Sequence, residues 1–264
     1  MTSPDFPASR RTALPSSANG QSWGIAEEVP VEIGFNGKAW TVMMASPTDL
    51  EDLAVGLALT EGIVELGSDI ETVDIRQFPE GITADIHLPE IKLKTERLQK
   101  RALDGRTGCG LCGVETLADL HRPTSGPTNQ TLVSETAIKA AFDALPDHQP
   151  LNAETRTVHA AAWCDPDGTI RLVREDIGRH NALDKLAGAR LRDGDPETPG
   201  FVILSSRCSY ELVFKAARLH ASLLASLSAP TGMALDLARS LNLGLATRGP
   251  NGQIIQFSGE KKDG

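Results

Sequence analysis

The second half of the sequence alternates short apolar runs with segments of helical periodicity, and this alternation restricts the fold more than any other feature. A helix is expected at 134–145, and strands at 157–164 and 169–173 flank a turn at 165–168. The later elements are expected helices at 181–191, 210–220 and 230–241, and expected strands at 201–204, 222–226, 243–246 and 253–257. Such alternation is typical of an α/β fold in which helices cover both faces of one sheet.

The first half predicts a smaller α+β unit. Two alternating runs at 29–35 and 39–44 flank Asn36-Gly37, which is a strong signal for a β-hairpin turn. The other expected elements are a helix from 47 to about 62 with Ser46 as its N-cap, strands at 70–78 and 82–88, and a charged helix at 90–102.

These patterns divide the chain into four parts. We expect a disordered tail over residues 1–25, a small α+β domain at 26–104, a mobile cysteine loop with a short helix and linker at 105–130, and a three-layer α/β/α domain at 131–264. The tail is rich in Ser, Pro and Ala and lacks an apolar signal core, so no secretory signal is predicted.

Composition narrows the cellular setting. The 264 residues are 40% hydrophobic and carry a formal net charge of −9, which disfavours general binding to nucleic acid. No uninterrupted apolar run approaches the roughly 18 residues that would suggest a membrane helix. Four cysteines, of which only two are close in sequence, make a poor disulfide framework. We therefore expect a cytoplasmic protein without a membrane partner.

Two thiols, Cys109 and Cys112, lie three residues apart among Gly108, Gly110 and Gly113 and ahead of an expected helix. Glycines favour a mobile loop, and a helix N-terminus stabilises a thiolate. A Cys-x-x-Cys pair also suits a structural zinc site, but no second pair completes a tetrahedral set. A thioredoxin-type dithiol would follow a strand directly. A persulfide carrier, which needs a nucleophilic thiolate that can move, fits best.

Polar clusters follow two of the expected strands, where α/β folds bind ligands. The segment 174–185 packs cations, amides and carboxylates around Gly178 and includes His180. Ordinary helix capping by Asn181 is the alternative for this segment. At 205–211, two serines and a helix N-terminus could receive a phosphate, with Arg207 as the fork-shaped cation. Two such junctions in one sheet favour an anionic ligand.

Several motifs together resemble the FdhD family of formate dehydrogenase accessory sulfur carriers. They occur in the family's order between about residues 29 and 257, and they are the segments 50–63, 108–113, 178–185, 209–217 and 228–231. The resemblance implies a cytidine-deaminase-like fold for the second domain. Deamination itself is excluded, because zinc deaminases need a His-x-Glu motif followed by Pro-Cys-x-x-Cys. Here His159-Ala160-Ala161 lacks the glutamate, and the cysteine pair lies upstream with no preceding proline.

The resemblance also implies an activity, that of a sulfurtransferase. A cysteine desulfurase would donate persulfide sulfur to Cys109, with Cys112 as a helper or resolving thiol. The sulfur would pass to a molybdenum or tungsten bis-molybdopterin guanine dinucleotide cofactor that serves formate dehydrogenase. GDP would be a partial mimic of this cofactor. Separately, we expect the protein to be a homodimer. The family's cofactor-binding loop corresponds to Ala246, Thr247, Arg248, Gly249, Pro250 and Asn251.

Three positions depart from the family pattern: Ala246 replaces a usual aromatic residue, Ser206 a glycine and Phe257 a tyrosine. The alternative function from another class is a zinc-stabilised, nucleotide-binding chaperone that escorts the cofactor or the apoenzyme without transferring sulfur. The thiol count predicts no stoichiometric metal, which disfavours the chaperone.

Overall fold

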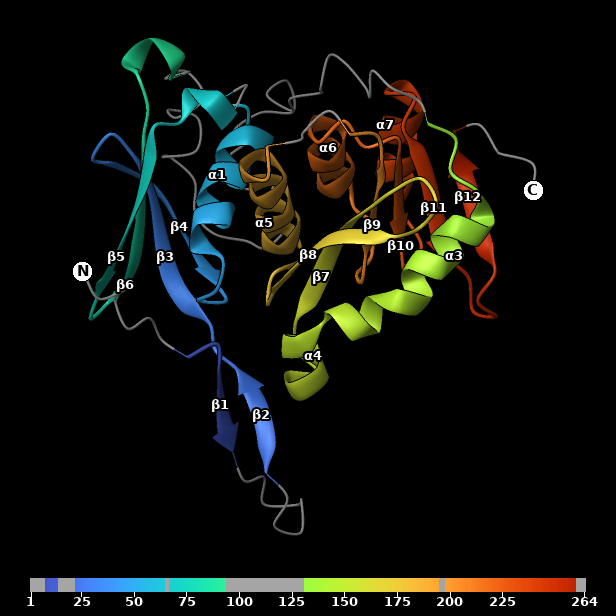
Figure 1. Ribbon diagram of the computed structural model, residues 1–264, viewed down its shortest axis with the longest axis horizontal. Coiled ribbons are helices and arrows are strands. Elements are labelled where there is room, and N and C mark those ends of the chain that lie inside the picture. Colours follow the sequence, from blue (N-terminus) through green and yellow to red (C-terminus); the bar gives the residue numbers. More distant parts are fainter. Residues whose placement is uncertain (1–7, 14–21, 65–66, 94–130, 195–197, 260–264) are drawn as a thin grey trace.

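The computed structural model describes residues 8–13, 22–64, 67–93, 131–194 and 198–259. The chain forms a four-stranded sheet, a six-stranded sheet and a two-stranded ribbon. Figure 1 shows the four-stranded sheet on the left, the six-stranded sheet on the right and helices between them. None of the helices in these described ranges is long and apolar enough to cross a membrane.

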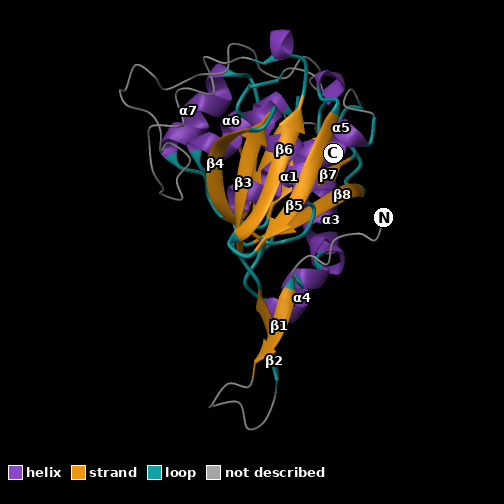
Figure 2. Cartoon of the chain, turned by 90° about the vertical axis from the view of Figure 1, so that its left-hand side faces the viewer, coloured by secondary structure: helices purple, strands orange, loops and turns teal. Residues whose placement is uncertain are grey.

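The N-terminal four-stranded sheet has the strand order β4-β3-β6-β5. Its strands are β3 (Val29–Phe35), β4 (Lys38–Ala45), β5 (Thr72–Phe78) and β6 (Gly81–His87). The hairpin predicted at Asn36-Gly37 is confirmed, with both residues at positive φ (50° and 77°). One face packs on helix α1 (Leu50–Thr60) through a core that includes Ile33, Phe35 and Leu53. None of the helices in the described part of the chain covers the opposite face, which Figure 2 shows from the front.

The six-stranded sheet has the order β12-β11-β10-β9-β7-β8. Its strands are β7 (His159–Cys164), β8 (Ile170–Asp176), β9 (Phe201–Leu204), β10 (Leu223–Ser226), β11 (Gly244–Arg248) and β12 (Ile254–Ser258). The three strands β9, β10 and β11 are parallel, whereas β7 is antiparallel to both β8 and β9. The carboxyl ends of β8, β9, β10 and β11 therefore meet at one edge, where β7 begins.

Helices cover both faces of this sheet, which confirms the predicted α/β class. The helices are α3 (Glu135–Ala144), α4 (Pro150–Thr155), α5 (Arg179–Arg192), α6 (Tyr210–Arg218) and α7 (Gly232–Ser240). One core joins α5, α6 and α7 to strand residues such as Trp163, Val202 and Leu245. A second core joins α3 to the alternate strand residues, including Ile203 and Ala246.

The two sheets are connected through α1 and α5, which lie side by side (Figure 1). Their backbones approach closely at Gly56 and Gly188, because a Cβ on either residue would meet backbone atoms of the other helix. Buried charges accompany this contact. Lys215 Nζ lies 2.9 Å from Asp184 Oδ1, and Thr60 Oγ1 donates to the same Asp184 atom over 2.6 Å.

Several predictions about the first half were wrong. Ser46 does not cap α1, which begins at Leu50 after Asp49, because the Ser46 hydroxyl instead accepts a hydrogen bond from the Ile177 N–H. The stretch 1–25 is not all disordered tail, since β1 (Arg10–Ala13) and β2 (Trp23–Ala26) pair as an antiparallel ribbon. The ribbon stands against α4, where Arg10 forms an ion pair with Glu154.

The charged helix predicted at 90–102 is also corrected where the structure describes it. Residues Glu90–Lys92 form a single 3-10 turn (η2) that ends at the extended Leu93, and a second such turn (η1, Gly67–Asp69) precedes β5. In the second half the sequence missed the short helix α4 and the 3-10 turn before it (η4, Leu145–His148). The strand and helix boundaries there otherwise fall within a few residues of the predicted ones.

Candidate anion-binding site

The candidate site lies at the edge where β8 and β9 end and β7 begins. His159 opens β7 and pairs with Asp176, the last residue of β8. On the other side of β7, Ser205 follows β9, donates its N–H to the Ala160 carbonyl and accepts the Ala160 N–H on its hydroxyl. The register of β8, β7 and β9 therefore places His159 between the ends of β8 and β9. Helix α5 follows β8, and helix α6 follows β9.

Helices α5 and α6 begin beside each other at this edge. Their first turns carry His180 and Glu211, whose Nε2 and Oε2 atoms are 2.9 Å apart. Both side chains are largely buried, at 15% and 9% exposure, and the two atoms are not aligned for a hydrogen bond. The contact brings the first turns of the two helices together at this edge.

Positive charge gathers around His159. Burial lowers the pKa of His159 below its ordinary value of 6.5, and Arg179, His180 and Arg207 lower it further, whereas Asp176 opposes them. Neither Arg179 nor Arg207 has a carboxylate partner within the described residues. An excess of cationic groups at one edge of a chain with net charge −9 requires a local reason. Binding of an anion would supply that reason.

The start of α6 adds backbone donors to this cluster. Ser209 is the N-cap, but its hydroxyl makes no cap hydrogen bond, and its buried Oγ has no partner in the described part of the chain. The neighbouring Ser206 hydroxyl donates to the Arg207 carbonyl over 2.9 Å. The first N–H groups of α6 and the arginine side chains together are suited to phosphate oxygens.

Of the predicted site residues, His180 and Arg207 belong to this cluster and Arg248 lies apart from it. The turn predicted between the last two strands is confirmed, because the Gly249 N–H donates to the Gln253 carbonyl over 2.7 Å. Arg248 is on the α3 side of the sheet, where its Nη2 atom is 2.6 Å from Asp143 Oδ1. Hydrogen bonds from Lys139 and Arg248 lower the pKa of Asp143.

The rest of the predicted cofactor loop is mostly structural or exposed. Ala246 is fully buried in the α3 core, and the Thr247 hydroxyl donates to the Ser226 carbonyl over 2.9 Å. Pro250 and Asn251 are exposed. A ligand at the cationic edge could reach these exposed residues across two strand spacings, about 10 Å. Their role in ligand binding stays a prediction.

The predicted thiol pair Cys109 and Cys112 lies outside the described residues. The other two cysteines, Cys164 and Cys208, are free and fully buried, as the sequence predicted for core thiols. Burial raises the pKa of Cys164 far above the usual thiol range and that of Cys208 to about 12. Neither thiol forms a thiolate at neutral pH, so neither suits nucleophilic sulfur capture.

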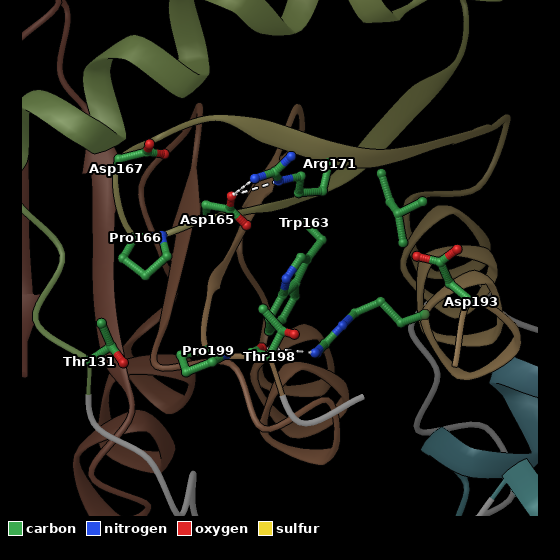
Figure 3. A pocket seen from close by; sticks show the side chains of 11 residues that line it. Thr131, Trp163, Asp165, Pro166, Asp167, Arg171, Asp193, Thr198 and Pro199 are labelled. Carbon is green, nitrogen blue, oxygen red and sulfur yellow. Dashed lines mark hydrogen bonds and ion pairs between the residues drawn. The ribbon is translucent and has the colours of Figure 1, made fainter. Parts of the chain in front are cut away.

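A cavity of about 730 Å³ lies at the other end of β7, lined by residues such as Trp163 and Asp165. Figure 3 shows its lining side chains. Its walls include Trp163, Asp165 and Arg171, and Asp165 forms an ion pair with Arg171. Arg190 stacks on the Trp163 ring at 3.3 Å from its centroid and donates to the Thr198 carbonyl. Since Arg171 is paired with Asp165 and the lining also includes Asp167 and Asp193, this cavity is less suited to an anion than the edge around His159.

Two residues of the cluster were missed as site residues, His159 and Arg179. Arg179 lies in the same polar segment as His180, so the sequence could have predicted it as a site residue. His159 could not have been predicted in this way. Its place at the site depends on β7 running antiparallel to β9, which brings the start of β7 to the carboxyl end of β9. Helix capping by Asn181, the alternative for this segment, does not occur: Gly178 is the N-cap, and the Asn181 amide donates to Asp176 and to the Met44 carbonyl.

The fold and the site define an α/β protein that carries a cationic edge and, in sequence, a separate Cys-x-x-Cys pair. The model of the FdhD/NarQ family matches residues 26–262, and the chain belongs to this family. It is 44% identical over 221 residues to a sulfur carrier protein FdhD of Xanthomonas campestris pv. campestris (strain B100), covering 84% of this chain and 79% of that one. A sulfur carrier protein FdhD of Bordetella petrii is 43% identical over 225 residues, covering 85% and 81%.

One solved structure supports the fold. It is the crystal structure of a protein from Desulfotalea psychrophila that is described as a formate dehydrogenase accessory protein. The TM-score is 0.70, and the match covers 94% of this chain and 96% of the other at 21% identity. At that identity the similarity concerns the arrangement of helices and strands alone.

Proposed function

We propose that this protein is a sulfur carrier that takes persulfide sulfur from a cysteine desulfurase and delivers it for the cofactor of formate dehydrogenase. The observation that carries the proposal is membership of the FdhD/NarQ family together with the Cys109–Cys112 pair. Relatives that are 42–44% identical over most of the chain bear the name sulfur carrier protein FdhD. The protein would act in the reducing cytoplasm, as a homodimer.

Sulfur capture by Cys109 is a thiol exchange. The Cys109 thiolate attacks the terminal sulfur of the donor's persulfide, a new S–S bond forms on Cys109, and the donor cysteine leaves as a thiolate. Cys112 can then attack Cys109, which gives a Cys109–Cys112 disulfide and releases hydrosulfide. A cellular dithiol would reduce that disulfide and restore the carrier. Cys164 and Cys208 cannot replace this pair, because their buried thiols stay protonated.

The receiving cofactor, a bis-molybdopterin guanine dinucleotide with molybdenum or tungsten, is the client of the carrier. We propose that one of its pyrophosphates binds at the cationic edge formed by His159, Arg179, His180 and Arg207. Support comes from the lowered pKa of His159 and from the start of α6 at the same edge. The residues present fit an anion of this kind. GDP, which represents half of the client cofactor, should bind there too.

Mass spectrometry after incubation with a cysteine desulfurase and cysteine tests the sulfur step. One added sulfur atom is expected on Cys109, and Cys109→Ala should abolish it. Cys164→Ala and Cys208→Ala are matched controls that should retain the adduct, although each removes buried volume. Full persulfide on Cys109→Ala would contradict the proposal. Stoichiometric zinc that is lost in a Cys109→Ala, Cys112→Ala double variant would favour the chaperone.

Calorimetry with GDP tests the cofactor step separately. Arg207→Ala should weaken GDP binding by about 1.5–3 kcal/mol, the usual scale for a hydrogen bond to a charged group. Persulfide formation on Cys109 should be unchanged in this variant. Arg171→Ala is the control, because it removes a similarly exposed arginine at the opposite end of β7. Equal effects of the two substitutions would place the ligand elsewhere.

A further inference from the structure

Ser46 lies in the loop between β4 and α1, yet all its polar groups contact the second half of the chain. The Ser46 N–H donates to Asp176 Oδ2 over 3.0 Å, and its carbonyl accepts from Lys185 Nζ over 3.0 Å. Its hydroxyl accepts the Ile177 N–H over 3.1 Å. Ser46 is fully buried. A helix cap would not need these contacts, which span about 130 residues of sequence.

The Asp176 carboxylate extends the same network to the turn before α5. Its Oδ2 atom is 2.7 Å from Lys185 Nζ, and both side chains are fully buried. Its Oδ1 atom accepts the Gly178 N–H over 2.8 Å and the Asn181 amide over 3.0 Å. The Asn181 amide also donates to the Met44 carbonyl over 2.9 Å. One carboxylate thus joins the end of the N-terminal sheet to the first turn of α5.

Arg179 and His180 lie between the anchored residues Gly178 and Asn181. Gly178 is the N-cap of α5 and, as a glycine, has no side chain that could cap the helix and fix this turn. The Ile177 N–H is held by the Ser46 hydroxyl, and the Gly178 N–H is held by Asp176. The direction in which Arg179 and His180 leave the turn therefore depends on a residue of the N-terminal half.

We propose that Ser46 is a positioning residue of the cationic edge, which it serves by fixing the turn that presents Arg179 and His180 beside His159. The assignment of an anion to that edge rests on the proposed function, but the positioning itself does not. Without the Ser46 hydroxyl, the Ile177 N–H has no acceptor and the turn can relax. Arg179 and His180 then move away from His159, and the site loses charge density.

The test compares Ser46→Ala with Thr60→Val. Thr60 is an equally buried hydroxyl of the N-terminal half that donates to Asp184 of α5, but it lies away from the Asp176–Asn181 turn. In Ser46→Ala, pyrophosphate should bind about tenfold more weakly, a usual size for coupling between sites. The His159 resonance in the ligand-free protein should titrate closer to 6.5. Thr60→Val should lower thermal stability without either change.

Asn181→Ala provides a second variant that removes a half-buried amide from the same turn, and it should change affinity and titration in the direction of Ser46→Ala. Unchanged affinity and titration in Ser46→Ala, or equal changes in Thr60→Val, would overturn the proposal. If wild-type protein does not bind pyrophosphate while the His159 titration still responds to Ser46→Ala, positioning is supported and the anion function is lost. The two ideas therefore fail separately.

Discussion

The side chains around His159 oppose its protonation until a negative charge joins them. In the free protein, burial and the charges of Arg179, His180 and Arg207 lower the pKa of His159. A bound anion reverses the sign of the nearby potential and so raises that pKa. Binding must then be accompanied by proton uptake, and by linkage the affinity must increase as the pH falls through the pKa of the complex.

We predict that sulfate binds more tightly at pH 6 than at pH 8. The affinity should rise about tenfold over one pH unit if binding takes up one proton across that unit. Sulfate itself gains no proton there, so the uptake belongs to the protein. Calorimetry in two buffers of different ionisation enthalpy measures the number of protons. His159→Gln should reduce the number of protons taken up. Identical uptake in wild type and His159→Gln would mean that a group other than His159 takes up the proton.

Ser46 and Asn181 show why residue roles are harder to predict than residue positions. Both are short polar residues near the start of a helical pattern, so local rules read them as N-caps. In the structure their partners are distant in sequence: Asp176 and Ile177 for Ser46, and Met44 for Asn181. A cap is a local contact that the sequence can suggest, whereas a contact across 130 residues depends on how the two halves pack.

At the scale of elements, the contact between α1 and α5 depends on glycine. Gly56 and Gly188 are interior helix residues, where alanine would ordinarily be more stable by about 1 kcal/mol. Here a Cβ on Gly56 would meet the Asp184 carbonyl, and one on Gly188 would meet the Asp52 carbonyl. The close approach also lets the buried Asp52 accept hydrogen bonds from Arg174 and Arg192.

Gly56→Ala should destabilise the protein by at least about 2 kcal/mol, since the added methyl meets backbone that can move only if the helices separate. Gly232→Ala is the matched control at the exposed first position of α7, where a Cβ meets nothing within 4 Å. That change should be neutral or stabilising by about 0.4–1 kcal/mol. Urea unfolding measures both. A stable Gly56→Ala would mean that α1 and α5 tolerate a wider separation.

The elements of the six-stranded sheet were predictable because its sequence signals are strong and local. The fully buried β9 is a short apolar run between turn residues, and the residue before α3, Ser134, is its N-cap, whose hydroxyl accepts the Ala137 N–H. The ribbon of β1 and β2 was not predictable, since its few residues are mixed in polarity. It depends on tertiary contact with α4, where a Cβ on Gly24 would meet the Glu154 carbonyl.

At the scale of the whole molecule, buried polar contacts cross between the two sheets in both directions. Asp176 and Lys185 bind the Ser46 backbone on one side, and Lys215 lies within 3.0 Å of the Thr60 hydroxyl on another. Separating the halves would expose or leave unpaired these buried charges, which is costly. Although each half has a core of its own, the contact between them is therefore part of the stability of each.

We predict that the two halves unfold in one cooperative transition, and the tryptophans allow this to be measured. Trp40 lies in the core of the N-terminal sheet at 8% exposure, and Trp163 lies in the core of the second at 3%. In Trp23→Phe, Trp163→Phe protein, fluorescence reports the first core, and in Trp23→Phe, Trp40→Phe protein it reports the second.

In each variant the fluorescence midpoint in urea should coincide with the midpoint from far-ultraviolet circular dichroism, because a single transition has one midpoint for every probe. Each variant is compared with itself, so the stability lost with Trp163 and its stacked Arg190 does not affect the result. Separate midpoints in either variant would show that the halves unfold independently.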